Sequence, residues 1–109
     1  MRAGAASRVG VPGTADVAAV NGAITQMAQT LAKELAPLRI NIVSPGMIDT
    51  PAFDAMPVAD RQAMFGHAAA AVPAKRVGRA DEIAEAAMFL IGSGFANGAL
   101  LDVDGGARA

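Results

Sequence analysis

Two stretches of the chain carry apolar residues at helical spacing. In the first, apolar side chains recur every three or four positions and form one face: Val17, Val20, Ile24, Met27, Leu31 and Leu35. Thr14 is suited to the N-cap, and Asp16 falls in the first turn, where the helix dipole favours a negative charge. Pro37 cannot continue a helix. The pattern predicts a long helix over 14–36.

The second stretch predicts a helix over 80–91, with an apolar face and with Asp81 and Glu82 in its first turn. Between the two helices, residues 51–73 have a mixed pattern that includes Pro57. We expect a mobile loop there that contains one short helix and ends before Pro73.

Two short stretches are typical of strands. Residues 39–44 alternate apolar and polar positions, and residues 98–104 are apolar and lead into a Gly-Gly pair. Helices of this length that alternate with strands favour an α/β fold with a parallel sheet and a right-handed crossover. Two strands and two long helices do not close such a sheet, so an apolar edge near residues 39–43 is left unpaired. We therefore expect part of a larger sheet, either truncated or completed by a partner.

Composition narrows the class of protein. The 109 residues suit one domain, with 53% hydrophobic residues and a net charge of −1. No basic stripe points to nucleic acid, and no apolar run approaches the roughly 18 residues of a membrane span. The chain has no cysteine, which excludes disulfides and thiolate metal sites and suits a cytoplasmic protein. His67 is the only histidine, so we expect no metal site and no histidine-based triad.

The candidate site follows the first strand, which ends at Pro45-Gly46. In open α/β sheets, ligands bind just outside the carboxyl ends of the strands. Gly46 allows the backbone to approach a flat ligand closely. Thr50 offers a hydroxyl, and Met47 and Ile48 offer backbone groups, to a carboxamide or phosphate. An ordinary turn is the alternative reading of these residues.

The longer pattern resembles a known family. "LAKELAPLRINIVSPGMIDTP", "RVGRADEIAEAAMFLIGS" and "GALLDVDGG" occur in that order. Together they resemble the C-terminal half of the short-chain dehydrogenase/reductase family, over residues 13–106. The resemblance implies a single, partial, doubly wound Rossmann-type domain over 1–109 that binds NAD or NADP. The implied reaction is hydride transfer between the nicotinamide and a small carbonyl or alcohol substrate.

The resemblance also implies roles for individual segments. Pro45, Gly46, Ile48 and Thr50 would meet the nicotinamide end of the cofactor, and residues 51–73 would form the substrate loop. The helix over 14–36 would pack against a sister subunit. We therefore expect a homo-oligomer, or pairing with a full-length relative.

The sequence departs from the family at its catalytic signature, Tyr-x-x-x-Lys. Val17 occupies the tyrosine position, Asn21 occupies the lysine position, and the chain has no tyrosine at all. The catalytic serine would fall near Gly4 or Ala3, and Ser7 is out of register. We therefore assign no catalytic residue. Asn21 could still donate a hydrogen bond to a ribose hydroxyl, or it could be an ordinary amide on a helix surface.

The family's glycine-rich phosphate loop is also missing from the sequence. Truncation alone does not explain Val17 and Asn21, and divergence alone does not explain the missing loop, so we expect that both occurred. For this chain alone we expect no competent catalysis. The alternatives are a non-catalytic assembly module and a degenerate fragment. The substrate and the choice between NAD and NADP stay open.

Overall fold

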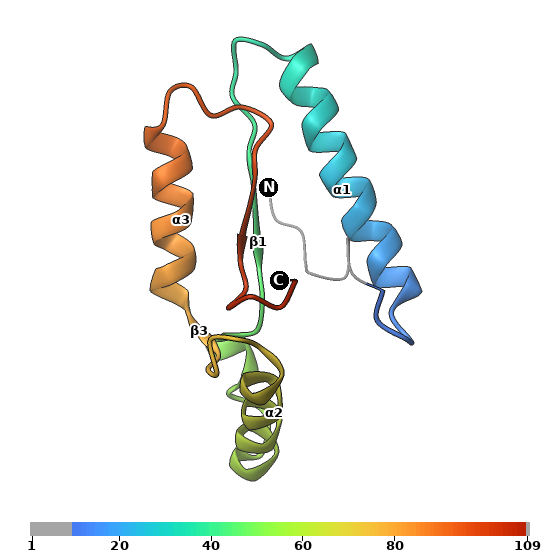
Figure 1. The fold of residues 1–109 in the computed structure, drawn as a ribbon, viewed down its shortest axis with the longest axis vertical. Coiled ribbons are helices and arrows are strands. Elements are labelled where there is room, and N and C mark those ends of the chain that lie inside the picture. The colour runs from blue at the N-terminus through green and yellow to red at the C-terminus, as the bar shows by residue number, and fades with distance from the viewer. Residues whose placement is uncertain (1–9, 109) are drawn as a thin grey trace.

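The computed structural model describes residues 10–108, so the expected serine position and Ser7 lie outside the described residues. The elements are α1 (Ala15–Glu34), β1 (Ile42–Pro45), β2 (Ile48–Asp49), a 3-10 turn η2 (Pro51–Phe53), α2 (Val58–Ala71), β3 (Gly78–Arg79), α3 (Ala80–Gly92) and β4 (Leu100–Val103). Strands β1 and β4 pair in parallel, from Ile42 opposite Leu100 to Pro45 opposite Val103. Figure 1 shows α1 and α3 on opposite sides of this pair. The expected α/β arrangement is confirmed.

Helix α1 packs on the sheet through small side chains. Its buried residues are Ala28 and Ala32, and Ala28 forms the centre of the core together with Ile42 of β1. Three large apolar residues of the helix are instead exposed, Val17, Val20 and Met27, as is Leu35 at its C-cap. Alanine brings the helix axis close to the strands, which leaves the bulky side chains pointing away from the sheet. The periodicity therefore locates the helix but does not identify the face that meets the sheet.

Strand β1 begins at Ile42, so the predicted start at residue 39 is wrong. The Arg39 guanidinium instead caps the carboxyl end of α3, where Nη1 donates to the carbonyls of Leu90 (2.9 Å), Ser93 (2.9 Å) and Ala96 (3.1 Å). Asn41 also donates to the Ala96 carbonyl, at 2.9 Å. These polar side chains satisfy the carbonyls at the helix end. Before Ile42, the one backbone hydrogen bond that the described residues make to the neighbouring strand segment runs from the Gly98 N–H to the Ile40 carbonyl, at 2.8 Å. The second strand is likewise shorter than the predicted 98–104.

Residues 51–73 are more helical than the predicted loop, because α2 alone spans 14 residues. No residue of α2 is buried, and Figure 1 shows the helix beyond the ends of the central strands. A second, very short parallel pair joins β2 to β3, with Ile48 opposite Gly78 and Asp49 opposite Arg79. The sequence analysis missed this pair, since two-residue strands produce no alternation that a pattern can reveal.

The chain after β4 turns sharply at Gly105 and Gly106, whose φ angles are +65° and +88°. Asp104 fixes this turn, because its carboxylate accepts the Gly106 N–H (3.0 Å) and Nε of Arg108 (3.0 Å). Its side chain is only 8% exposed, and Arg108 also pairs with Asp102. Alternating aspartates on a strand would be expected to face solvent, but the Asp104 side chain is buried, and Arg108 compensates its charge.

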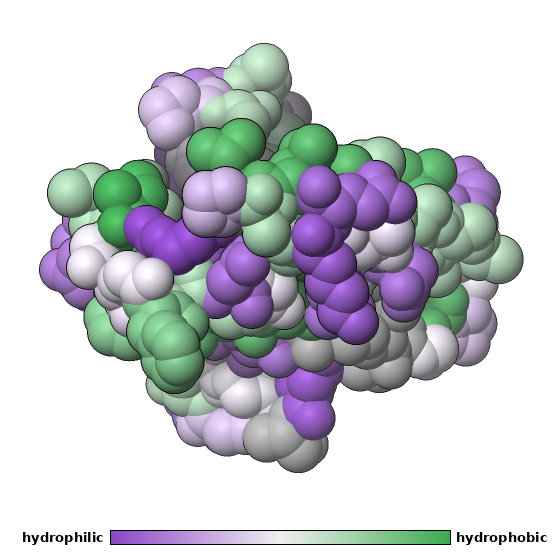
Figure 2. All heavy atoms as spheres, turned by 90° about the horizontal axis from the view of Figure 1, so that it is seen from above, coloured by the Kyte–Doolittle hydropathy of each residue, from purple (hydrophilic) through white to green (hydrophobic). Residues whose placement is uncertain are grey.

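Within residues 10–108, β1 and β4 pair only with each other, so both outer edges of this small sheet are open. Large apolar residues are exposed at the end of the molecule where the strands begin, including Leu38, Ile91 and Phe95. Figure 2 views this end and shows hydrophobic residues on the surface among hydrophilic ones.

None of the helices in the described part of the chain is long and apolar enough to cross a membrane.

Candidate functional site

A cleft of about 590 Å³ lies where β1 ends, between the first turns of α1 and the segment that carries α2. Its lining includes all five residues predicted to meet a cofactor: Asn21, Pro45, Gly46, Ile48 and Thr50. Val17 lines it as well. The remaining lining residues are Met47, Ala52, Phe53, Ala68, Ala71, Val72, Asp104 and Ala107. The fold therefore gathers the predicted residues in one place, while their role in binding stays a prediction.

Val17 and Asn21 reach the cleft from α1. They are four residues apart on the helix and so lie on the same face, one turn apart. In Figure 1 the N-terminal end of α1 lies at the end of the molecule where β1 stops. This antiparallel run of helix and strand brings the first turns of α1 to the carboxyl end of β1. Val17 is 48% exposed, so the cleft is open on this side.

Gly46 has a structural role that the sequence analysis did not anticipate. A Cβ atom on Gly46 would lie 2.8 Å from Cα of Asp104 and 3.0 Å from its Cβ. The Gly46 N–H also donates to the Val103 carbonyl, at 3.0 Å. The chain after β1 thus packs directly on the chain after β4, and only glycine fits there without displacement. This contact fixes the floor of the cleft.

The position of Ile48 in the cleft depends on Gly78. A Cβ on Gly78 would lie 2.6 Å from Cδ1 of Ile48, and the Gly78 N–H donates to the Met47 carbonyl at 2.9 Å. Strand β3 therefore packs against the part of the cleft wall that Met47 and Ile48 form. Sequence reasoning missed this contribution. The available signal was a glycine in an extended segment, which often marks a close backbone approach.

The lining contains few groups that can react. Among the described lining residues, Asp104 has the one ionisable side chain, and its carboxylate is already bound by Gly106 and Arg108. The other polar side chains are the Asn21 amide and the Thr50 hydroxyl. The cleft can thus hold an apolar ring and an uncharged polar group, but within residues 10–108 no lining side chain is placed to exchange a proton with a substrate. His67 lies exposed on α2, outside this lining.

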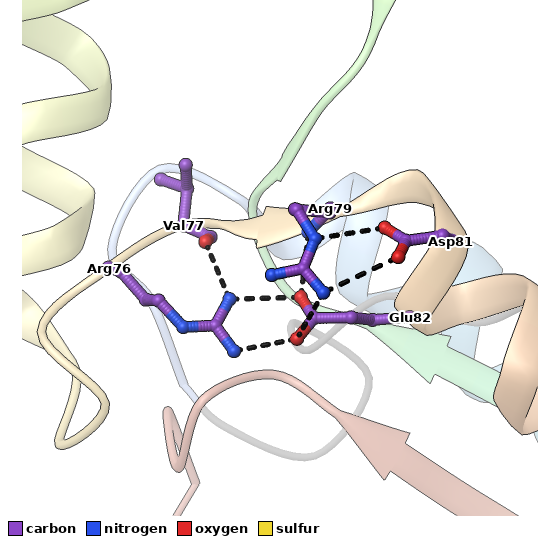
Figure 3. Close-up of polar contacts among 5 residues, drawn as sticks. All are labelled: Arg76, Val77, Arg79, Asp81 and Glu82. Carbon is purple, nitrogen blue, oxygen red and sulfur yellow. Dashed lines mark hydrogen bonds and ion pairs between the residues drawn. The ribbon is translucent and has the colours of Figure 1, made fainter.

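An ionic cluster lies next to the cleft, at the start of α3 (Figure 3). Arg76 grips the Glu82 carboxylate with two hydrogen bonds, of 2.9 and 2.6 Å, and Arg79 pairs with Asp81 at 3.0 Å. Both arginines therefore neutralise carboxylates in the first turn of α3. The hydrogen bonds from Arg76, and then that from the Arg79 N–H, lower the pKa of Glu82 from about 4.5 to about 2. Glu82 is therefore ionised at neutral pH.

Within residues 10–108, no three acidic or histidine side chains gather into a group that could hold a metal ion.

Comparison with known proteins identifies the family. A profile described as enoyl-(acyl carrier protein) reductase matches residues 3–108. The chain is 35% identical over 101 residues to 3-oxoacyl-[acyl-carrier-protein] reductase FabG of Thermotoga maritima, covering 89% of this chain and 39% of that protein. It is 36% identical over 107 residues to 2-(R)-hydroxypropyl-CoM dehydrogenase of Xanthobacter autotrophicus, covering 94% and 42%.

A solved structure shares the fold. The crystal structure of a small-chain dehydrogenase in complex with NADPH superimposes with a TM-score of 0.91 at 42% identity, covering 97% of this chain and 48% of that one. The chain thus spans less than half the length of each of these three proteins. The profile match over residues 3–108, the similar sequences and the shared parallel α/β fold show together that this chain belongs to the short-chain dehydrogenase/reductase family.

Proposed function

We propose that the cleft at the end of β1 binds the nicotinamide end of NAD or NADP, within an oxidoreductase site that acts on a small carbonyl or alcohol. The observation that carries this proposal is the convergence of Asn21, Pro45, Gly46, Ile48 and Thr50 on one cleft. The family relationship and the NADPH in a similar dehydrogenase structure support the choice of cofactor.

The lining residues fit this end of the cofactor. A volume of about 590 Å³ with mostly apolar walls suits a flat ring, and the Thr50 hydroxyl can donate to or accept from a carboxamide. The Asn21 amide can donate to a ribose hydroxyl. When bound, the nicotinamide would supply or accept the hydride. The residues of this chain would hold and orient the ring and exclude water from one of its faces.

We infer that this chain alone does not complete the reaction. Val17 and Asn21 stand where we place the family's tyrosine and lysine, and the chain contains no tyrosine. The ionisable residue of the lining, Asp104, is bound by Arg108. Loss of a general acid alone costs about 10²–10⁴-fold in rate. Reduction of a carbonyl by the purified chain and NADPH at a rate ordinary for an enzyme would refute this inference.

Calorimetric titration of the full chain with each cofactor tests binding directly. We expect NADH or NADPH to bind with a Kd of about 1 mM or tighter, which corresponds to roughly −4 kcal/mol. Thr50→Val keeps the side-chain volume but removes the hydroxyl, so binding should weaken about fivefold, by about 1 kcal/mol. Thr30→Val is the matched control, because Thr30 lies on α1 outside the cleft lining. No binding of either cofactor by a folded chain would refute the proposed site.

A second candidate function is assembly, and the exposed apolar side chains of α1 and its C-cap favour it. Val20 is 60% exposed, and Val17, Met27 and the C-cap Leu35 are each between 46% and 49% exposed. The partner would be a second copy of the chain or a full-length relative. If this face mediates association, light scattering should show an oligomer that Val20→Glu dissociates. Val58→Glu is the matched control, since Val58 is 59% exposed on α2. A monomeric wild-type chain would exclude self-assembly.

A further inference from the structure

Residues 50–77 form a projecting segment, here named the α2 arm, which builds one wall of the cleft. It contributes Thr50, Phe53, Ala68 and Val72 to the lining. Two contacts hold the arm together internally. The rings of Phe53 and Phe65 pack edge to face with centroids 5.4 Å apart, and Arg61 pairs with Asp54 at 3.1 Å. Because no residue of α2 is buried, the position of the arm depends on how its base is attached.

The base of the arm is attached to the sheet at two places. The Ala74 N–H donates to the Gly105 carbonyl at 3.0 Å, and Gly106 lies so close to Pro73 that an added Cβ would be 2.9 Å from Pro73 Cγ. The short β2–β3 pair is the second attachment, in which the Gly78 N–H donates to the Met47 carbonyl. Both attachments are small. The first consists of one backbone hydrogen bond and the packing of Gly106 on Pro73, and the second joins strands of two residues each.

The Arg76–Glu82 pair crosses from the arm to α3 at this base (Figure 3). Arg76 belongs to the arm, whereas Glu82 belongs to the first turn of α3, which packs on β1 and β4. Both oxygens of the Glu82 carboxylate accept from Arg76, at 2.6 and 2.9 Å, and one of them also accepts the Arg79 N–H at 2.9 Å. The Glu82 side chain is 22% exposed, and a bidentate pair of this kind has a fixed orientation.

Helix capping alone does not account for this geometry. Capping requires only that Glu82 accept the Arg79 N–H, and a neutral glutamine at that position would do the same. The bidentate grip of Arg76 is additional, and it connects two segments that share no backbone hydrogen bond at these residues. Arg76 and Glu82 also line, together with Ile48 and Val72, a cavity of about 110 Å³ directly behind the cleft wall.

We propose that Arg76 and Glu82 form a clasp that sets the position of the α2 arm against the sheet, and so sets the width of the cleft. Arg76 and Glu82 are thus positioning residues, acting through the arm and through Ile48. The clasp is a property of the unliganded chain. The proposal therefore goes beyond the proposed cofactor site. It can be tested without a cofactor, and its failure would leave the cofactor site unaffected.

Hydrogen exchange on the full unliganded chain tests the clasp. Arg76→Gln removes the bidentate grip but keeps the cap between Glu82 and Arg79. Exchange in residues 58–79 should rise about three- to tenfold in this variant, while exchange in β1, β4 and the second half of α3 stays unchanged. Glu85→Gln, an exposed carboxylate on the same helix, is the matched control and should change neither region.

Two further results distinguish a clasp that positions the α2 arm from a pair that only stabilises the whole fold. The exchanged pair Arg76→Glu with Glu82→Arg should restore part of the protection that each single variant loses. Equal acceleration throughout residues 10–108 would show that the pair only stabilises the fold, and would overturn the proposal. Unchanged exchange in Arg76→Gln would overturn it too. If Arg76→Gln weakened cofactor binding while hydrogen exchange stayed unchanged, this result would contradict the clasp but not the proposed cofactor site.

Discussion

Gly46 packs against the backbone of Asp104, so that the chain leaving β1 touches the chain leaving β4. A Cβ at Gly46 would come within 2.8 Å of the Asp104 Cα, a distance that real Cβ atoms do not adopt. The contact involves backbone on one side, so a rotamer change cannot relieve it. It couples the floor of the cleft to the turn that Arg108 and Gly106 hold in place.

Gly46→Ala should therefore destabilise the protein and distort the cleft. Overpacking of this kind costs about 1–3 kcal/mol, measurable by urea unfolding. Gly22→Ala is the matched control, because an added Cβ there meets nothing within 4 Å. Gly22 lies inside α1, so that substitution should stabilise the fold by up to about 1 kcal/mol. Equal effects of the two substitutions would show that the contact with Asp104 is unimportant.

Arg39→Lys should cost stability even though the charge is kept. The guanidinium donates to four carbonyls at the end of α3, with the shortest hydrogen bond, to Ile91, at 2.7 Å. An ammonium group cannot span these acceptors, since it lacks the planar fork. We expect a loss of about 1.5–3 kcal/mol by urea unfolding.

The control for Arg39 is Lys33→Gln, an exposed change on α1 that should stay within about 0.5 kcal/mol. If Arg39→Lys unfolds at the same urea concentration as the wild type, water must replace the guanidinium at the helix end without loss.

Glu82 should make stability depend on acidic pH. Its pKa is lowered to about 2 in the folded chain, mainly by the hydrogen bonds from Arg76, and returns to about 4.5 on unfolding. A lowered folded pKa means that the contribution is fully present above pH 4.5 and is lost as the pH falls from 4.5 towards 2. The difference in Tm between the wild type and Glu82→Gln should shrink over this range. A difference that is constant from pH 6 to pH 2.5 would contradict the assignment.

Ser44→Ala should be neutral or stabilising, which is unusual for a residue at the centre of a sheet. Ser44 is fully buried in β1, and its Oγ has no hydrogen-bond partner among the described residues. Removal of an unsatisfied buried hydroxyl should gain about 1 kcal/mol. Urea unfolding measures this, with Ser93→Ala as a partly exposed control. Destabilisation by Ser44→Ala would mean that the hydroxyl has a partner in solution.

Much of the architecture could be predicted from local pattern. The spacing of apolar residues located the helices that became α1 and α3, because a 3.6-residue period is readable in one dimension. The Pro45-Gly46 exit from a strand predicted a ligand-binding edge, and the cleft lies there. The resemblance in "RINIVSPGMIDTP" pointed to the family that the profile match then showed.

The details of the site required the tertiary structure. The sequence could not reveal that Ala28, rather than Val20 or Met27, faces Ile42, because both faces of the helix carry apolar residues. It could not reveal β2 and β3, whose two-residue length leaves no periodic signal. It could not reveal the surroundings of Asp104 either, since the charge that compensates this carboxylate comes from Arg108, on the far side of a turn.

The amino-acid sequence by itself thus determined the two long helices, the two longer strands, their order along the chain and the family, all of which depend on neighbouring residues and on matched motifs. Tertiary structure alone decided which faces are buried, why Gly46 must be glycine, and which residues meet Glu82. Those properties depend on contacts between residues that lie far apart along the chain or in adjoining elements. Such contacts form only when the helices close around the parallel strands.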